Sequence, residues 1–186
     1  MARVQRDAYG LFGDPADMQI RTLDTLDEVR TLDGLLGEYI KFVCDDLKRA
    51  HSVSFDADVL MANTRGSLHK VVPPHGTTLV AQADDGTRLG MGFLRPSGPN
   101  AMEIKRLYVP PEGRGRGVGK TLVMRAIKIA AERGATVLRL DSTRNLETAI
   151  GLYRSLGFVE CAPYRESDHY DDPVLSPYLI FMEKRL

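Results

Sequence analysis

The chain has 186 residues, 43% of them hydrophobic, and its 25 basic and 25 acidic side chains give a formal net charge of zero. This length suits one domain with a single good core, and the balanced charge gives no bulk signal for nucleic-acid binding. Two cysteines, Cys44 and Cys161, exclude a disulfide framework, and four scattered histidines give no metal-ligand spacing, so we expect no metal.

The N-terminal residues give no targeting signal. They read M-A-R-V-Q-R-D and lack the apolar segment of a secretory signal, and no apolar run in the chain approaches membrane-spanning length. Residues 1–16 show no sustained periodicity and are predicted to form a loose arm, followed by a single domain over residues 17–186. We therefore expect a cytoplasmic protein without membrane or nucleic-acid partners.

The first third of the domain is predicted to contain one strand and two helices. A short strand at residues 18–23 precedes a helix over about 26–47, where apolar side chains recur at helical spacing. Gly34 and Gly37 weaken this helix and predict a bend or a break. A second short helix is expected at residues 55–61, and a loop at 63–76.

Three consecutive strands are then expected to form an antiparallel meander. Asp84-Asp85-Gly86 joins the first two strands, and Asp-Gly is a strong hairpin signal. Prolines at positions 110 and 111 end the third strand, because proline cannot donate to a sheet ladder. The expected strands cover residues 77–83, 88–94 and 101–109.

The second half of the chain alternates helices with strands. Apolar residues at three- and four-residue steps predict a helix over residues 118–133. The strand after this helix is expected to pair in parallel with the strand at 101–109. The later elements are expected to be a strand at 136–140, a helix at 146–156, a strand at 158–161, a polar segment at 162–177 and a last strand at 178–182.

A turn rich in glycine and arginine separates the third meander strand from the helix that follows. Glycines occupy alternate positions from 113 to 119, with Arg114 and Arg116 between them. Glycines let the backbone approach a ligand closely, and a helix start offers unpaired N–H groups and positive potential. Two arginines add bidentate donors. The turn is therefore predicted to bind an anion, such as the phosphates of a cofactor.

Of three known phosphate-binding patterns, the turn matches one. The P-loop pattern requires glycine at position 114, where the chain has Arg114, and the dinucleotide pattern requires glycine at position 118 or 120. The pattern Q/R-x-x-G-x-G/A is fully matched by Arg114, Gly117 and Gly119. It resembles the acetyl-CoA pyrophosphate loop of the GCN5-related N-acetyltransferase (GNAT) superfamily.

A second motif strengthens this resemblance. The segment from Ala149 to Phe158 resembles the A-x-x-L-Y-x-x-x-G-F sequence of the same superfamily and follows the loop in the expected order. The resemblance implies an α/β (α+β) fold, in which a mixed, mostly antiparallel V-split sheet of about six to seven strands is flanked by about four helices. Many members carry an asparagine three residues before the alanine, where this chain has Leu146. Asn145 is the neighbouring candidate for a pantetheine contact, or it is only a helix N-cap.

The activity that the resemblance implies is direct transfer of an acetyl group from acetyl-CoA to a primary amine, without a covalent enzyme intermediate. Tyr153 is the candidate general acid, because a phenol of pKa about 10 can share its proton with a leaving thiol of pKa about 8.5. The alternative is a core tyrosine on an apolar helix face.

Glu103 is the candidate general base by its placement in the histone-acetyltransferase branch of the superfamily. Strand alternation predicts that Glu103 shares one face with Lys105, Leu107 and Val109. The alternatives are a surface ion pair with Lys105 and a water molecule as the base.

The resemblance also implies the contacts of the cofactor. The strand is expected to splay near Val109, so that backbone groups there bind the pantetheine arm and the oxyanion. The expected cofactor-binding residues are Leu107, Tyr108, Val109, Arg114, Gly115, Arg116, Gly117, Val118, Gly119, Lys120, Asn145 and Tyr153.

The acceptor site is expected between residues 39–55 and 164–178. In the second segment, Arg165 could bind a carboxylate and Asp171 an ammonium group. The other candidates there are Tyr164, His169, Tyr170 and Asp172, and a solvated loop is the alternative. A small-molecule amine, such as an amino acid or a polyamine-like compound, is the favoured acceptor.

Several alternatives remain open. The acceptor can be a protein N-terminus or a lysine, and the domain can bind CoA without catalysis or bind a nucleotide through the Gly/Arg turn. Pairing of superfamily members through sheet edges makes a homodimer possible.

Overall fold

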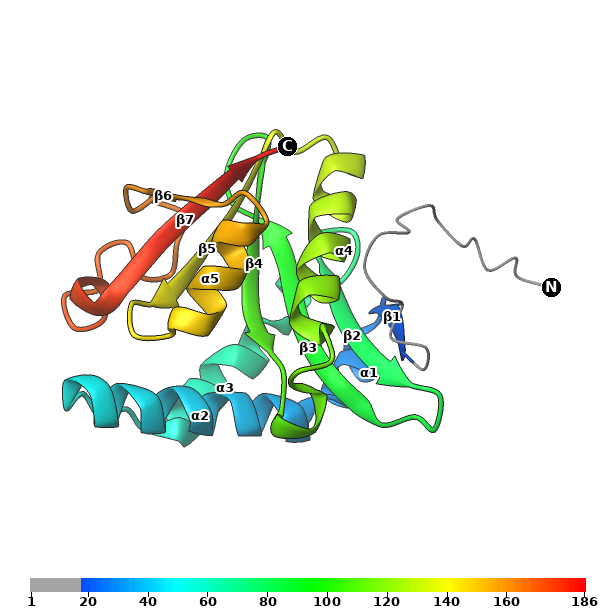
Figure 1. The fold of residues 1–186 in the computed structure, drawn as a ribbon, viewed down its shortest axis with the longest axis horizontal. Coiled ribbons are helices and arrows are strands. Elements are labelled where there is room, and N and C mark those ends of the chain that lie inside the picture. Colours follow the sequence, from blue (N-terminus) through cyan, green and yellow to red (C-terminus); the bar gives the residue numbers. More distant parts are fainter. Residues whose placement is uncertain (1–17) are drawn as a thin grey trace.

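The computed structural model describes residues 18–186, so the arm predicted for residues 1–16 lies outside the described residues. Figure 1 shows the helices and strands of the described part of the chain. They are β1 (Met18–Leu23), α1 (Leu26–Arg30), α2 (Asp33–His51), α3 (Ala57–Gly66), β2 (Thr77–Ala83), β3 (Arg88–Pro96), β4 (Ala101–Tyr108), α4 (Val118–Glu132), β5 (Val137–Thr143), α5 (Glu147–Ser155), β6 (Val159–Cys161) and β7 (Leu179–Arg185).

The described strands form one seven-stranded sheet in the order β1-β2-β3-β4-β5-β7-β6. Every neighbouring pair is antiparallel except β4 and β5, which are parallel and are connected through α4. Two parallel strands need a crossover connection, and α4 provides it between β4 and β5. The apolar face of α4 packs on the sheet. The mixed, mostly antiparallel sheet predicted from the sequence is confirmed.

The first predicted helix is divided into α1 and α2. Thr25 caps α1 in a capping box, in which its side chain accepts from the Glu28 N–H and the Glu28 carboxylate accepts from the Thr25 N–H. The helix is interrupted at residues 31–32, before the glycines at which the break was expected. Gly34 and Gly37 lie inside α2. The expected break at these glycines was wrong. Since neither glycine has a positive φ, both fit a regular helix.

The segment after α2 is more ordered than predicted. Asp56 caps α3, which extends to Gly66, and a short 3₁₀ helix follows at Leu68–Val71 where the sequence predicted a loop. Leu68 and Val71 are buried in the core that α1 and α2 form against the sheet. Burial of these two side chains therefore fixes a segment whose local sequence favours a loop.

Two helical layers cover the sheet. On one face, α4 and α5 bury Val118, Leu122, Ala126 and Ile150 against the strands. On the other face, α1 and α2 bury a second core that includes Val29, Leu36 and Ile40 against β2, β3 and β4. The lower end of the sheet in Figure 1 is where the long α2 crosses it.

The sheet divides between β4 and β5. These strands pair over only four positions, from Ala101 with Val137 to Ile104 with Leu140, whereas β5 stays paired with β7 as far as Thr143. Just past the last pair, Arg106 has φ +54° and the register between β3 and β4 shifts. This β-bulge bends β4 away from β5, so the predicted V-shaped split is confirmed.

The bulge overturns one prediction from strand alternation. Glu103 and Lys105 do lie on the face opposite the α4 core, but Leu107 and Val109 pack against that core. One extra residue in a strand shifts all later side chains to the other face. The four residues therefore do not share a face.

Candidate active site at the sheet split

The Gly/Arg turn leads from the end of β4 into α4. Gly115 and Gly117 have φ +73° and +75°, and Gly117 is the N-cap of α4 without a side-chain capping bond. In the described residues, no backbone acceptor bonds the N–H groups of Gly115, Arg116 and Gly117. Added to the open first turn of α4, these groups form a cluster of donors at the positive end of a helix dipole, which is suited to bind a phosphate.

The glycines of the turn serve two purposes. A Cβ on Gly115 or Gly117 would meet no atom within 4 Å, so the chain is open on that side. A Cβ on Gly113 would lie 2.2 Å from the Leu89 carbonyl oxygen. Gly113 therefore lets the turn lie directly on β3, while Gly115 and Gly117 face the open side with left-handed backbone.

The two arginines of the turn point in different directions. The Arg114 Nε donates to the Val109 carbonyl at 3.2 Å, and its guanidinium lies 5.8 Å from the centre of the Phe42 ring. Arg116 lines a cavity of about 390 Å³ together with Asp84, Asp85 and Glu112. Arg114 thus joins the turn to the end of β4, and Arg116 extends toward the β2–β3 hairpin.

Tyr153 lies on α5 and its side chain is only 6% exposed. Its ring packs against the Phe158 ring, with 5.9 Å between the ring centres, as the ring of a core tyrosine would. Its hydroxyl has no hydrogen-bond partner in the described part of the chain. Burial raises the pKa of Tyr153, helped by the nearby Tyr39 and Asp141, so the hydroxyl stays protonated and is free to donate.

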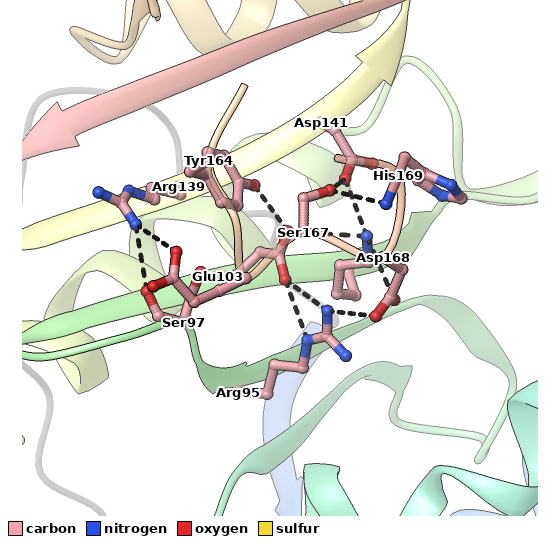
Figure 2. Close-up of polar contacts among 11 residues, drawn as sticks. Arg95, Ser97, Glu103, Arg139, Asp141, Tyr164, Ser167, Asp168 and His169 are labelled. Atoms are coloured by element: carbon pink, nitrogen blue, oxygen red, sulfur yellow. Dashed lines mark hydrogen bonds and ion pairs between the residues drawn. The ribbon is translucent and has the colours of Figure 1, made fainter. Parts of the chain in front are cut away.

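A buried polar cluster lies on the opposite face of the sheet, beneath the segment that precedes β7 (Figure 2). Glu103 is fully buried at its centre. Its Oε2 accepts from the Arg95 Nε at 3.0 Å and from the Arg95 Nη2 at 2.8 Å, and its Oε1 accepts from the Tyr164 hydroxyl at 2.6 Å. Both carboxylate oxygens of Glu103 are therefore engaged by neighbouring side chains, and its predicted role as a base stays a prediction.

An ion pair crosses the split itself. The Lys105 Nζ on β4 lies 2.9 Å from the Asp141 Oδ2 on β5, one residue beyond the last paired positions of the two strands. Burial disfavours the charge of Lys105, but Asp141 and Glu103 outweigh it and raise the pKa of Lys105. Ser167 also donates to Asp141, at 3.1 Å. The pair therefore links both halves of the sheet to the covering segment.

His169 lies at the edge of this cluster. Its backbone N–H donates to the Ser167 Oγ at 3.1 Å (Figure 2). Its Nδ1 lies 3.7 Å from the Asp172 Oδ2. Burial lowers the pKa of His169, and the cations Lys105 and Arg106 lower it further against the opposing effect of Asp141. His169 is thus held neutral at neutral pH.

Asn145 connects the β5–α5 turn to α2. Its Nδ2 donates to the buried Asp46 at 2.6 Å, and its Oδ1 lies 3.1 Å from the His51 Nε2. The cap of α5 is Leu146, so the alternative that Asn145 caps this helix is wrong. Both polar ends of the Asn145 amide have partners, and the predicted cofactor contact stays a prediction.

The family model described as the acetyltransferase (GNAT) family matches residues 41–158. The chain belongs to the GNAT family. It is therefore an N-acyltransferase of the acyl-CoA-dependent class, as the two sequence motifs predicted.

Individual relatives agree with this family assignment. An uncharacterized N-acetyltransferase of Schizosaccharomyces pombe is 36% identical over 74% of this chain and 85% of its own length. An L-2,4-diaminobutyric acid acetyltransferase of Nocardia farcinica is 31% identical over 44% of this chain and 42% of its own length. A solved N-acetyltransferase of Thermoplasma acidophilum in complex with coenzyme A has a TM-score of 0.65 and 22% identity, covering 91% of this chain and 99% of that one.

Within this GNAT domain, the predicted acceptor residues are divided. Tyr164 is buried and His169 is partly buried in the polar cluster, whereas Arg165 and Asp171 are exposed. Sequence reasoning missed Arg95, Arg106, Asp141 and Asp168. For Arg95 and Asp141, the only signal was a charged residue directly after an expected strand, whereas the bulge residue Arg106 and the loop residue Asp168 gave no local signal.

The described residues contain no helix that is long and apolar enough to cross a membrane. They also contain no group of three or more histidine, cysteine or acidic side chains arranged to hold a metal ion.

Proposed function

We propose that this GNAT protein transfers an acetyl group from acetyl-CoA to a primary amine of a small molecule. The observation that carries the proposal is the open donor cluster of Gly115–Gly117 at the uncapped start of α4, next to the split between β4 and β5. The donor cluster is suited to bind a pyrophosphate. The split leaves backbone groups of β4 without a strand partner. The coenzyme A complex of the Thermoplasma relative supports the same donor.

The proposed roles of the residues follow from their positions. The turn from Arg114 to Lys120 holds the pyrophosphate, and backbone groups of Leu107, Tyr108 and Val109 bind the pantetheine arm and the developing oxyanion. Tyr153 donates its proton to the leaving thiolate, because its hydroxyl is protonated and has no competing partner in the described residues.

We propose that a water molecule acts as the general base and accepts the proton of the attacking amine. Glu103 is the alternative base, but it is enclosed by Arg95 and Tyr164. We propose that Glu103 instead anchors the covering segment to β4. The preference for a small amine is supported by the relative named for L-2,4-diaminobutyric acid, a small diamine with a carboxylate.

The decisive experiment compares thermal shifts with acetyl-CoA, CoA, ATP and NAD. A ligand that binds only the native state stabilises it by about 2.7 kcal/mol at a hundredfold excess over its Kd. Selective shifts with acetyl-CoA and CoA, followed by thiol release in the presence of small amines, are the expected result. A shift with ATP or NAD alone would overturn the proposal. A CoA shift without turnover of small amines, but with acetylation of peptides, would move the acceptor to proteins.

A further inference from the structure

Arg106 is the residue at the bulge of β4. A non-glycine residue with φ +54° is uncommon, and the left-handed backbone is strained for a side chain as large as arginine. Bulges near active sites commonly re-aim a side chain. Here the bulge lies two residues beyond Ile104, the last residue of β4 that pairs with β5. It therefore places the Arg106 side chain at the split.

The Arg106 guanidinium is directed to the side of the sheet covered by α2 and α3. The Arg106 Nη2 is 3.5 Å from the Thr64 Oγ1 on α3, and the Arg106 Cζ lies 5.9 Å from the centre of the Tyr39 ring on α2. The first turn of α4 packs through Val118 on the other face of the sheet, although the Arg114 guanidinium of the preceding turn reaches the Phe42 ring on α2. Arg106 is thus positioned toward an acceptor rather than toward the pyrophosphate.

Arg106 lacks the acidic partner that neighbouring cations have. Arg95 is paired with Glu103 and Asp168, and Lys105 is paired with Asp141. No described carboxylate lies within ion-pair distance of Arg106, although its side chain is partly buried. Against the opposing effect of burial, Arg106 helps to lower the pKa of Asp168, but this carboxylate is within ion-pair distance of Arg95 and Lys105 instead. A partly desolvated guanidinium is expected to seek a carboxylate or phosphate in bidentate geometry.

We propose that Arg106 binds a carboxylate of the acceptor, so that the substrate class is an amino acid or a similar amine that carries a carboxylate. The inference rests on the proposed function and adds the acceptor to it. The carboxylate lies beneath α2 and α3, and the amine points into the split toward Tyr153. Arg165, the carboxylate reader suggested by the sequence, is exposed and is replaced in this role by Arg106.

The test uses matched pairs of amines that differ only in the carboxylate. The pairs are L-2,4-diaminobutyrate and the proteinogenic L-amino acids, each with its carboxamide. Thiol release from acetyl-CoA gives kcat/KM for the wild type, Arg106→Met, Arg106→Lys and the control Arg185→Met. Arg185 is an exposed arginine at the far end of β7, where it pairs with Val137 away from the split.

The wild type is expected to prefer carboxylate members by about 10- to 100-fold, the usual effect of a hydrogen bond to a charged group. Arg106→Met should abolish this preference by raising KM for the carboxylate members alone. Arg106→Lys keeps the positive charge but loses the bidentate donors of the guanidinium, so it should retain part of the preference. The control Arg185→Met should retain all of it.

Two outcomes overturn the inference: an unchanged preference in Arg106→Met, and the absence of turnover of every carboxylate amine. Thermal shifts with acetyl-CoA separate this failure from failure of the proposed function. A persisting acetyl-CoA shift in the wild type leaves the proposed function standing, whereas its absence rejects that function itself. If Arg106→Met does not fold, the preference is read from Arg106→Lys and Arg106→Gln.

Discussion

Lys105 and Asp141 face each other across the split in the sheet, with 2.9 Å between the Nζ and Oδ2 atoms. Both side chains are largely buried, at 5% and 12% exposure. A buried pair costs desolvation when it forms, but removal of one partner leaves an uncompensated buried charge. The pair therefore holds the apex of the split only as long as both members are present.

Asp141→Asn is expected to lower the free energy of unfolding by about 3 kcal/mol, the lower range for breaking a buried ion pair. Urea unfolding monitored by circular dichroism measures this change. The double variant Lys105→Met/Asp141→Leu should recover part of the loss, because it removes both charges. A single variant as stable as the wild type would show that the pair does not hold the split.

Glu103→Gln distinguishes an anchor from a base. As an anchor, Glu103 binds Arg95 and Tyr164, so the variant should lose about 1–3 kcal/mol of stability while the pH profile of kcat/KM keeps its shape. If Glu103 is the base, kcat falls by about 100-fold or more and the ascending limb of the profile changes. Denaturant unfolding and a pH–rate profile on the same preparation separate the two roles.

Tyr153→Phe is expected to reduce kcat by about 100-fold or more, as for loss of a general acid, without a comparable change in the KM for acetyl-CoA. Because the hydroxyl has no partner in the described residues, stability should change by less than about 0.5 kcal/mol. A stopped-flow or steady-state thiol assay measures the first effect, and thermal unfolding the second. Unchanged kcat would leave Tyr153 a core residue.

Gly117→Ala tests the phosphate-binding turn, with Gly134→Ala as its control. Both glycines have positive φ, at +75° and +78°, and neither would place a Cβ within 4 Å of another atom. The backbone strain of the two substitutions should therefore match, at about 1 kcal/mol. Only Gly117→Ala should raise the KM for acetyl-CoA. Equal KM values in the two variants would argue against pyrophosphate binding by this turn.

His169 predicts a pH dependence of stability. Its folded pKa is lowered from the ordinary value of about 6.5. The unfolded chain then binds more protons than the native state in mild acid, so this contribution to stability is full above about pH 6.5 and is lost as the pH falls through the folded pKa.

Denaturant unfolding between pH 7 and pH 5 should therefore show a smaller loss of stability in His169→Gln than in the wild type. An identical slope in the two proteins would contradict the prediction. The charged groups that act on His169 from the surrounding elements are Lys105, Arg106, Asp141, Asp168 and Asp172.

Local signals in the sequence predicted much of the fold. The bounds of β1 and β2 are those expected, since turn residues mark their ends, and the apolar face of α4 is buried as predicted. The bulge at Arg106 was not predicted, because Arg-Leu-Tyr in a strand reads as ordinary alternation. The polar cluster was also missed, since Arg95, Glu103 and Asp168 meet only when distant segments fold together.

The segment between β6 and β7 has little regular structure, yet Tyr164, Ser167 and Asp168 attach it to three strands of the sheet. Glu166 adds a contact with Arg139 on β5 and Leu175 is buried, whereas Arg165 and Asp171 are exposed and take no part in these attachments. Substitutions at Arg165 and Asp171 should therefore leave both the position of this segment and the donor-binding turn intact. The surface of this segment can therefore change its exposed side chains during evolution while the buried contacts keep its backbone fixed against the sheet.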